Sequence, residues 1–160
     1  MDEYFNNAVG TKLSASDVAR AVVKFMREDT SRRYKIFIGS DSEGHAGDNT
    51  DFVTAVVVHR VGNGGRFFWR RAELKRFHNL HDRIIQEVLL SLDAAKEILE
   101  SLRKFKDVPD FDFEIHIDVG EKGETRSMTQ EVIGMVRAYN FEPRIKPESY
   151  AATNVADRYV

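Results

Sequence analysis

The chain has 160 residues and a net charge of −2, and 42% of its residues are hydrophobic, so a single domain can bury a core without covalent staples. It contains no cysteine, which excludes disulfides and thiolate–zinc sites and leaves oxygen or imidazole ligands for any metal. No apolar run reaches the roughly 20 residues of a membrane span, and the acidic start has no signal-peptide pattern, so we expect a soluble cytoplasmic protein without a membrane partner.

The first half of the chain predicts a helix followed by three antiparallel strands. Residues 1–13 show no regular pattern, and a helix over about residues 14–29 begins with a serine cap. Clusters of β-forming residues predict strands at residues 34–40, 52–60 and 66–72. A loop at residues 42–51 joins the first strand to the second, and a glycine-rich turn at residues 62–65 joins the second to the third.

The second half of the chain alternates helices with strands. Helices are predicted at residues 81–104, from Thr125 onward and at 151–159, and strands at 113–119 and 143–146. Three strands followed by alternating helices and strands are typical of a mixed α/β sheet flanked by helices. We therefore expect one compact domain, with residues 1–32 as an N-terminal extension carrying an extra helix and residues 33–160 as the main body.

Four acidic side chains stand at informative places in this pattern. Asp41 directly follows the first strand and Asp118 lies near the end of the fourth, so parallel pairing of these strands would bring both to one sheet edge. Glu87 borders the apolar stripe of the long helix, and Asp157 lies in a terminal helix of small residues. Carboxylates held close together repel each other unless a cation separates them or one keeps its proton. Oxygen ligands of this kind suit Mg²⁺ or Mn²⁺.

Each of these acids also has a structural interpretation. An aspartate after a strand commonly forms a turn or caps a helix, and Glu87 alone fits a solvated helix position. The structural interpretation is weaker for Asp118, because its strand looks central and a buried unpaired carboxylate is costly. The functional interpretation depends on the four acids occurring together in this order of elements.

A basic segment with aromatic residues follows the hairpin turn. Its candidates for holding a nucleic-acid backbone or stacking on bases are Arg66, Trp69, Arg70, Arg71, Lys75 and Arg76. Charges on an edge strand also prevent aggregation through that edge, and this alternative stays open.

Three segments carry the most specific pattern: residues 36–42 (IFIGSDS), 115–123 (IHIDVGEKG) and 146–159 (KPESYAATNVADRY). Through them, residues 33–160 resemble the YkuK-like family of uncharacterised ribonuclease H-like proteins. The resemblance implies a five-stranded mixed sheet of order 3-2-1-4-5, counted along the chain, with an antiparallel second strand. It also implies that the acids at four places bind two metal ions, and these places correspond to Asp41, Glu87, Asp118 and Asp157.

Two classes of function fit this resemblance. A metal-dependent nuclease would hydrolyse phosphodiesters with two Mg²⁺ or Mn²⁺ ions about 3.5–4 Å apart, and Asp41 and Asp118 would be the central ligands. Lys122 would lie near the site and His116 would assist there, although a histidine between apolar neighbours is more often a core residue. The alternative is a non-catalytic nucleic-acid-binding or assembly module on the same fold. Nucleic acid is the expected partner in both cases.

Two further hypotheses receive less support from the sequence. A nucleotide phosphatase or ATPase-like protein is disfavoured because no Walker-type glycine–lysine motif is present. A histidine metal site at His78 and His81 lacks an evident third ligand nearby.

Overall fold

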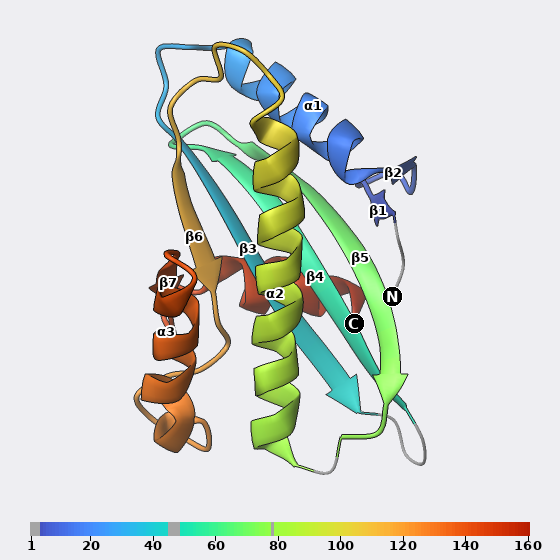
Figure 1. Cartoon of the computed structure of the whole chain (residues 1–160), viewed down its shortest axis with the longest axis vertical. Helices are drawn as coiled ribbons and strands as arrows, with labels where there is room; N and C mark the ends of the chain where they lie inside the picture. The colour runs from blue at the N-terminus through green and yellow to red at the C-terminus, as the bar shows by residue number, and fades with distance from the viewer. Residues whose placement is uncertain (1–3, 45–48, 78) are drawn as a thin grey trace.

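A single mixed β-sheet organises the chain (Figure 1). The computed structural model describes residues 4–44, 49–77 and 79–160. The strands are β1 (Phe5–Asn6), β2 (Lys12–Leu13), β3 (Tyr34–Gly44), β4 (Asn49–Arg60), β5 (Gly65–Lys75), β6 (Asp112–His116) and β7 (Glu142–Arg144). The helices are α1 (Ala15–Arg27), α2 (Leu80–Leu102) and α3 (Thr129–Ala138), with short helical turns η1 (Arg126–Met128), η2 (Ala151–Val155) and η3 (Ala156–Tyr159).

The mixed α/β architecture agrees with the prediction, whereas the prediction of five strands is wrong. The sheet has seven strands in the order β2-β1-β5-β4-β3-β6-β7. β4 is antiparallel to both of its neighbours, and β6 is parallel to both β3 and β7. The two extra strands extend the sheet beyond β5, while the longer strands keep the neighbours that the sequence predicted.

The extra strands come from the N-terminal segment, which the sequence pattern left irregular. The Asn7 side chain accepts two backbone N–H bonds and closes the turn between β1 and β2. Asn6 pairs with Trp69 of β5, and Phe5 is fully buried beneath the guanidinium of Arg70, which lies 4.6 Å from the ring centre. The burial of Phe5 against residues distant in sequence therefore holds β1 and β2 at this edge of the sheet. No local sequence pattern predicts such a contact.

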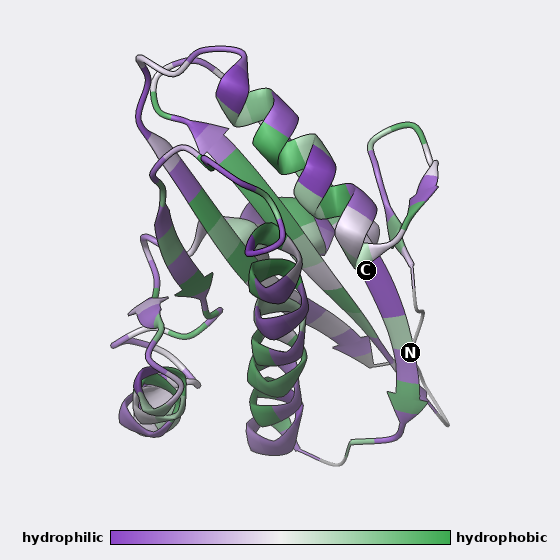
Figure 2. Ribbon diagram, turned by 45° about the horizontal axis from the view of Figure 1, so that its top comes forward, coloured by the Kyte–Doolittle hydropathy of each residue, from purple (hydrophilic) through white to green (hydrophobic). Residues whose placement is uncertain are grey.

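Helices cover one face of the sheet (Figures 1 and 2). Of the two predicted cap candidates, Ser14 and Ser16, it is Ser14 that caps α1, because its side chain accepts the Asp17 N–H while the Asp17 carboxylate accepts the Ser14 N–H. The apolar sides of α1, α2 and α3 pack with Ile36, Ile38 and Ile115 in the main core. Figure 2 shows apolar residues concentrated along the central strands and alternating with polar residues around α1 and α2.

The C-terminal turns cover part of the opposite face. In Figure 1 they cross behind the sheet, whereas α2 crosses in front. Ala151, Val155 and Ala156 pack there against Phe37 of β3 and Val53 of β4. The last helical segment is thus a π-helical turn followed by a 3₁₀ turn, in place of the single short helix that was predicted.

β3 is longer than the sequence pattern predicted. Its ladder with β4 continues through Ser42, opposite Phe52, to Gly44, so Asp41 is a paired strand residue and does not follow the strand. The predicted loop at residues 42–51 is accordingly wrong at both of its ends, and residues 45–48 lie outside the described part. Backbone pairing with β4 outweighs the local preference of these small polar residues for a loop.

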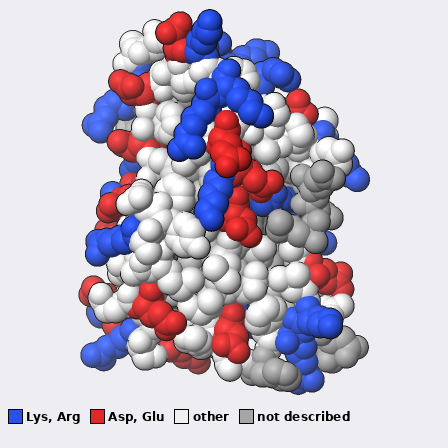
Figure 3. Space-filling model, in the orientation of Figure 1, with Lys and Arg blue, Asp and Glu red and all other residues white. Residues whose placement is uncertain are grey.

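The surface over α2 carries charges of both signs. Figure 3 shows Lys and Arg side chains interleaved with Asp and Glu on this face, without a continuous basic patch. None of the described helices combines the length and the apolar character that crossing a bilayer requires.

Candidate functional site

Asp41 and Asp118 reach the same end of the sheet because their strands are parallel neighbours. Gly39 of β3 pairs with His116 of β6, and each aspartate lies two residues beyond that pair. β6 ends at His116, earlier than predicted, but the chain stays extended beside β7, because the Ile117 N–H bonds to the backbone oxygen of Arg144 at 2.9 Å. The two aspartates therefore share a level along the sheet and a face of it.

Asp41 interacts with two other acids. Its pKa rises to about 7, chiefly because the carboxyl group is buried, and next because it shares a hydrogen bond with Asp157. The negative charges of Asp118 and Asp157 raise this pKa further, while the Ser42 N–H, 2.9 Å from Oδ1, opposes the rise. The protein thus holds a carboxyl group at a place where ionisation is unfavourable.

Asp157 comes to Asp41 from η3, where its side chain is exposed at the surface. The neighbouring Tyr159 stacks on Trp69 with the ring centres 4.6 Å apart. Arg71 donates a hydrogen bond to the Tyr159 backbone oxygen at 2.6 Å. These contacts attach the end of the chain to β5 and hold the segment that carries Asp157.

Glu87 lies on the α2 side of the same sheet end. Glu87 is only 4% exposed, and the Ser42 hydroxyl donates a hydrogen bond to its Oε2. One helical turn further on, the hydroxyls of Ser91 and Ser40 are 2.7 Å apart, which fixes the register of α2 over β3. Burial raises the pKa of Glu87 well above its ordinary value, and the charges of Asp41 and Asp118 add to this effect.

A cation that the sequence analysis missed pairs with Asp118. Lys146 Nζ lies 2.9 Å from Asp118 Oδ1. The Lys146 backbone N–H donates to the Val119 oxygen at 2.8 Å, which sets the two side chains next to each other. Lys122, the predicted auxiliary cation, is exposed in the loop after β6. The sequence offered one signal for Lys146. This residue follows β7, which is parallel to β6, and Asp118 follows β6.

The four acids supply carboxylate oxygens as potential metal ligands, and each acid already has at least one partner within the protein. Asp41 bonds with Asp157, Glu87 accepts from Ser42, and Asp118 pairs with Lys146. Over residues 4–44, 49–77 and 79–160, no three His, Asp or Glu side chains are arranged as a ready coordination shell. In charge and donor type the cluster fits a hard divalent cation, because such an ion would offset both the burial and the smaller mutual repulsion that raise the pKa of Asp41. Binding would require Lys146 to release Asp118.

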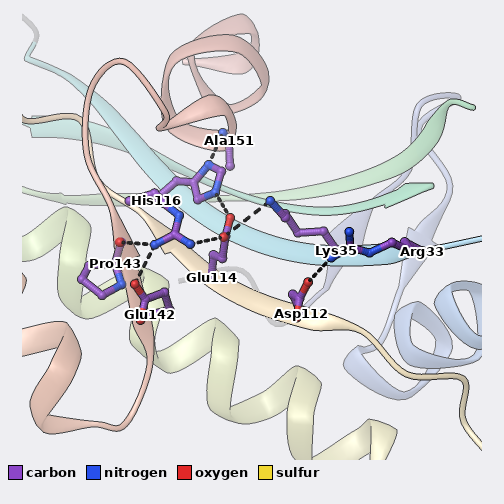
Figure 4. Close-up of polar contacts among 9 residues, drawn as sticks. Arg33, Lys35, Asp112, Glu114, His116, Glu142, Pro143 and Ala151 are labelled. Atoms are coloured by element: carbon purple, nitrogen blue, oxygen red, sulfur yellow. Dashed lines mark hydrogen bonds and ion pairs between the residues drawn. The ribbon is translucent and has the colours of Figure 1, made fainter. Parts of the chain in front are cut away.

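His116 takes part in a different network, shown in Figure 4. Its Nε2 lies 3.1 Å from Glu114 Oε1, and its Nδ1 accepts the Ala151 N–H at 3.1 Å. The ring stacks on Phe37 with 4.4 Å between the ring centres. Burial lowers the pKa of His116, and the neighbouring Glu114 opposes this shift. With both ring nitrogens bonded inside the protein, His116 anchors the start of η2 to β6.

Glu114 is the buried acceptor at the centre of this network. Arg144 Nη2 lies 2.9 Å and Lys35 Nζ 3.6 Å from Glu114 Oε2, so two cations and a histidine surround one carboxylate. Figure 4 shows Lys35 of β3 and His116 of β6 on either side of Glu114. Glu114 was not among the predicted residues, because its partners Lys35 and Arg144 come from other strands of the sheet.

The predicted basic segment does not form one surface, because successive residues of β5 point to opposite faces. Arg70 is buried and pairs with Glu97 at 2.6 Å on the helical face. On that face Arg66 also lies over Phe25, 4.7 Å from the ring centre. Trp69 and Arg71 contact the C-terminal turn on the other face, as described above, and Lys75 and Arg76 are exposed near the end of β5.

The proposed histidine pair gains no support from the described residues. His78 lies outside them, and His81 Nε2 is 2.9 Å from Glu131 Oε2. This contact and the nearby Asp82 raise the pKa of His81.

Comparison with known proteins confirms the resemblance that the three sequence segments indicated. The chain matches the family model described as ribonuclease H-like over residues 17–160. It is also 32% identical over 165 aligned positions to the uncharacterized protein YkuK of Bacillus subtilis (strain 168), covering 97% of this chain and 95% of that protein. No solved structure gives a significant match. The similarity extends over nearly the whole chain, and the name of the relative states no activity.

Proposed function

This chain belongs to the ribonuclease H-like family, and from that premise we propose that it is a metal-dependent nuclease that hydrolyses nucleic-acid phosphodiesters. The observation that carries the proposal is the meeting of Asp41, Asp118 and Asp157 at one sheet end, where Asp41 is held with a pKa of about 7. In a purely structural cluster, carboxylates held this close only destabilise the fold. In a site that receives cations, the same carboxylates attract and hold the bound ions.

The side chains have distinct roles in this proposal. Asp41 and Asp118 would be shared ligands at the centre, and Asp157 and Glu87 would each complete the shell of one ion. When bound, Mg²⁺ or Mn²⁺ would lower the pKa of a coordinated water and stabilise the leaving oxygen of the phosphodiester. Lys146, displaced from Asp118, would then be available to pair with a phosphate group of the substrate.

Burial of the cluster sets its sensitivity to pH. The raised pKa values of Asp41 and Glu87 mean that protons compete with cations for these oxygens up to near neutral pH. Cation binding should therefore strengthen as the pH rises from 6 to 8, and cleavage should follow the same trend.

Cleavage and metal binding should be tested together. Wild-type protein with Mg²⁺ or Mn²⁺ is incubated with single-stranded RNA, single-stranded DNA and an RNA–DNA hybrid, and Mn²⁺ binding is measured by calorimetry at pH 8. The variant Asp41→Asn should lose cleavage and most of the Mn²⁺ affinity. The control Asp93→Asn removes the same charge from an exposed position on α2 and should behave as the wild type. Equal behaviour of wild type and Asp41→Asn in both assays would refute the nuclease proposal.

A second candidate is a non-catalytic nucleic-acid-binding or assembly module. The observation that favours it is that Asp41, Glu87 and Asp118 each have a partner within the protein, including the cation Lys146. This candidate predicts retention on nucleic acid in the presence of EDTA, no cleavage with any metal, and no effect of Asp41→Asn on either result.

A further inference from the structure

The sheet face opposite α2 holds a pocket separate from the acidic cluster. Its volume is about 730 Å³, and it lies between the C-terminal segment and the exposed part of β3, β4 and β5. Lys35 and Phe37 form part of its floor, and Tyr150 and Arg158 form part of its wall. Pockets of roughly 300–1,000 Å³ accommodate small organic ligands.

The C-terminal segment separates the pocket from the acids. Phe37 and Asp41 lie on the same face of β3 four residues apart, which corresponds to about 13 Å along the strand. Val155 and Arg158 line the pocket, while Asp157 bonds with Asp41. A ligand in the pocket would therefore lie beside the acidic cluster and touch the segment that carries Asp157.

Aromatic rings line the pocket at three levels. Phe37 is buried and stacks on His116, which gives the floor a rigid aromatic pair. Phe67 is half-buried on β5, and Tyr150 is 49% exposed at the rim, edge-on to Phe37 with 5.7 Å between the ring centres. An exposed aromatic ring beside a buried one offers a stacking surface to a flat ligand.

The polar lining favours an anion. Three Arg and Lys side chains line the pocket against two Glu side chains, while Arg66, also at the pocket edge, turns its guanidinium toward Phe25 on the other face of the sheet. One of the two acids, Glu114, is buried and already pairs with Arg144 and with Lys35, the latter shown in Figure 4. Within the described part of the chain no carboxylate pairs with Arg158, and this exposed residue lines the pocket. The aromatic surface and the surplus positive charge together match a flat ring that carries a phosphate.

We propose that this pocket binds a nucleoside phosphate, with the base stacked on Tyr150 and Phe67 and the phosphate held by Arg158 and Lys35. The ligand is either a free mononucleotide or the terminal nucleotide of a single strand, since both present the same base and phosphate. The proposal stands on the lining residues of the pocket and goes beyond the nuclease activity proposed for the acidic cluster.

Binding of adenosine 5′-monophosphate to the full chain, measured by calorimetry, tests this site. We expect one saturable site and at least about tenfold weaker binding of adenosine alone and of inorganic phosphate alone. Tyr150→Ala and Arg158→Gln should each weaken binding by about fivefold or more. The matched controls Tyr139→Ala and Arg137→Gln change exposed residues of the α3 region and should bind as the wild type. Thermal unfolding establishes that each variant is folded.

Two further measurements distinguish a free nucleotide from a strand end, and the pocket proposal from the nuclease proposal. A 5′-phosphorylated single-stranded oligonucleotide that binds about tenfold tighter than the mononucleotide identifies a strand end, and equal affinity identifies the free nucleotide. Asp41→Asn should keep nucleotide binding, so loss of cleavage with retained binding separates the pocket from the acidic cluster. Absence of saturable binding by the nucleotide and the oligonucleotide, or full binding by both Tyr150→Ala and Arg158→Gln, overturns the proposal.

Discussion

Replacing Asp41 with asparagine should stabilise the metal-free protein at alkaline pH. The pKa of Asp41 rises from 3.8 to about 7, so between these pH values the folded state binds more protons than the unfolded state. The contribution of Asp41 to folding stability is then full below about pH 4 and is lost as the pH rises through about 7. At about 1.36 kcal/mol for each pH unit, the ceiling on this loss is about 4 kcal/mol. Asparagine avoids the loss because it stays neutral and keeps the oxygen that accepts the Ser42 N–H.

Thermal unfolding in EDTA between pH 4 and pH 8.5 measures this effect. For a chain of this size about 1 kcal/mol corresponds to roughly 2–4 °C in Tm, so Asp41→Asn should unfold about 4–10 °C above the wild type at pH 8. The difference should vanish near pH 4, and Asp93→Asn should show no such pH dependence. The reasoning is refuted if Asp41→Asn is no more stable than the wild type at pH 8, or if its advantage is the same at every pH.

Two pairs of substitutions test the networks on either side of the sheet by calorimetric unfolding. His116→Gln keeps one acceptor and one donor and should cost under about 1 kcal/mol, whereas His116→Leu leaves Glu114 and the Ala151 N–H without that partner and should cost about 2–4 kcal/mol. Equal losses would show that the ring fills space and does not anchor η2. Glu97→Ala leaves the buried charge of Arg70 without its partner and should cost about 3 kcal/mol of folding stability, whereas Arg70→Met should cost under about 1 kcal/mol. A larger loss for Arg70→Met than for Glu97→Ala would contradict the pairing.

The parts of the fold that local sequence patterns determine were predictable. Clusters of β-forming residues located the central strands, and a serine cap at Ser14 or Ser16 marked the start of α1. The neighbours of β3, and with them the meeting of Asp41 and Asp118, followed from the order of elements and the implied family fold.

The features that the sequence did not reveal depend on contacts between distant residues. Phe5 gains its burial only against β5, which converts an irregular segment into an edge hairpin. Residues 42–44 are polar and small, yet pairing with β4 keeps them in a strand. Lys146 lies beside Asp118 because the chain beyond β7 stays hydrogen-bonded to the chain beyond β6. Neither composition nor periodicity predicts this alignment.

Anomalous diffraction from crystals grown with Mn²⁺ at pH 8 would test the central claim most directly. We expect Mn²⁺ peaks within about 2.0–2.3 Å of carboxylate oxygens of both Asp41 and Asp118, with the Lys146 side chain moved away from Asp118. Absence of Mn²⁺ at this end of the sheet, with Lys146 still paired to Asp118, would contradict the assignment of these acids as metal ligands.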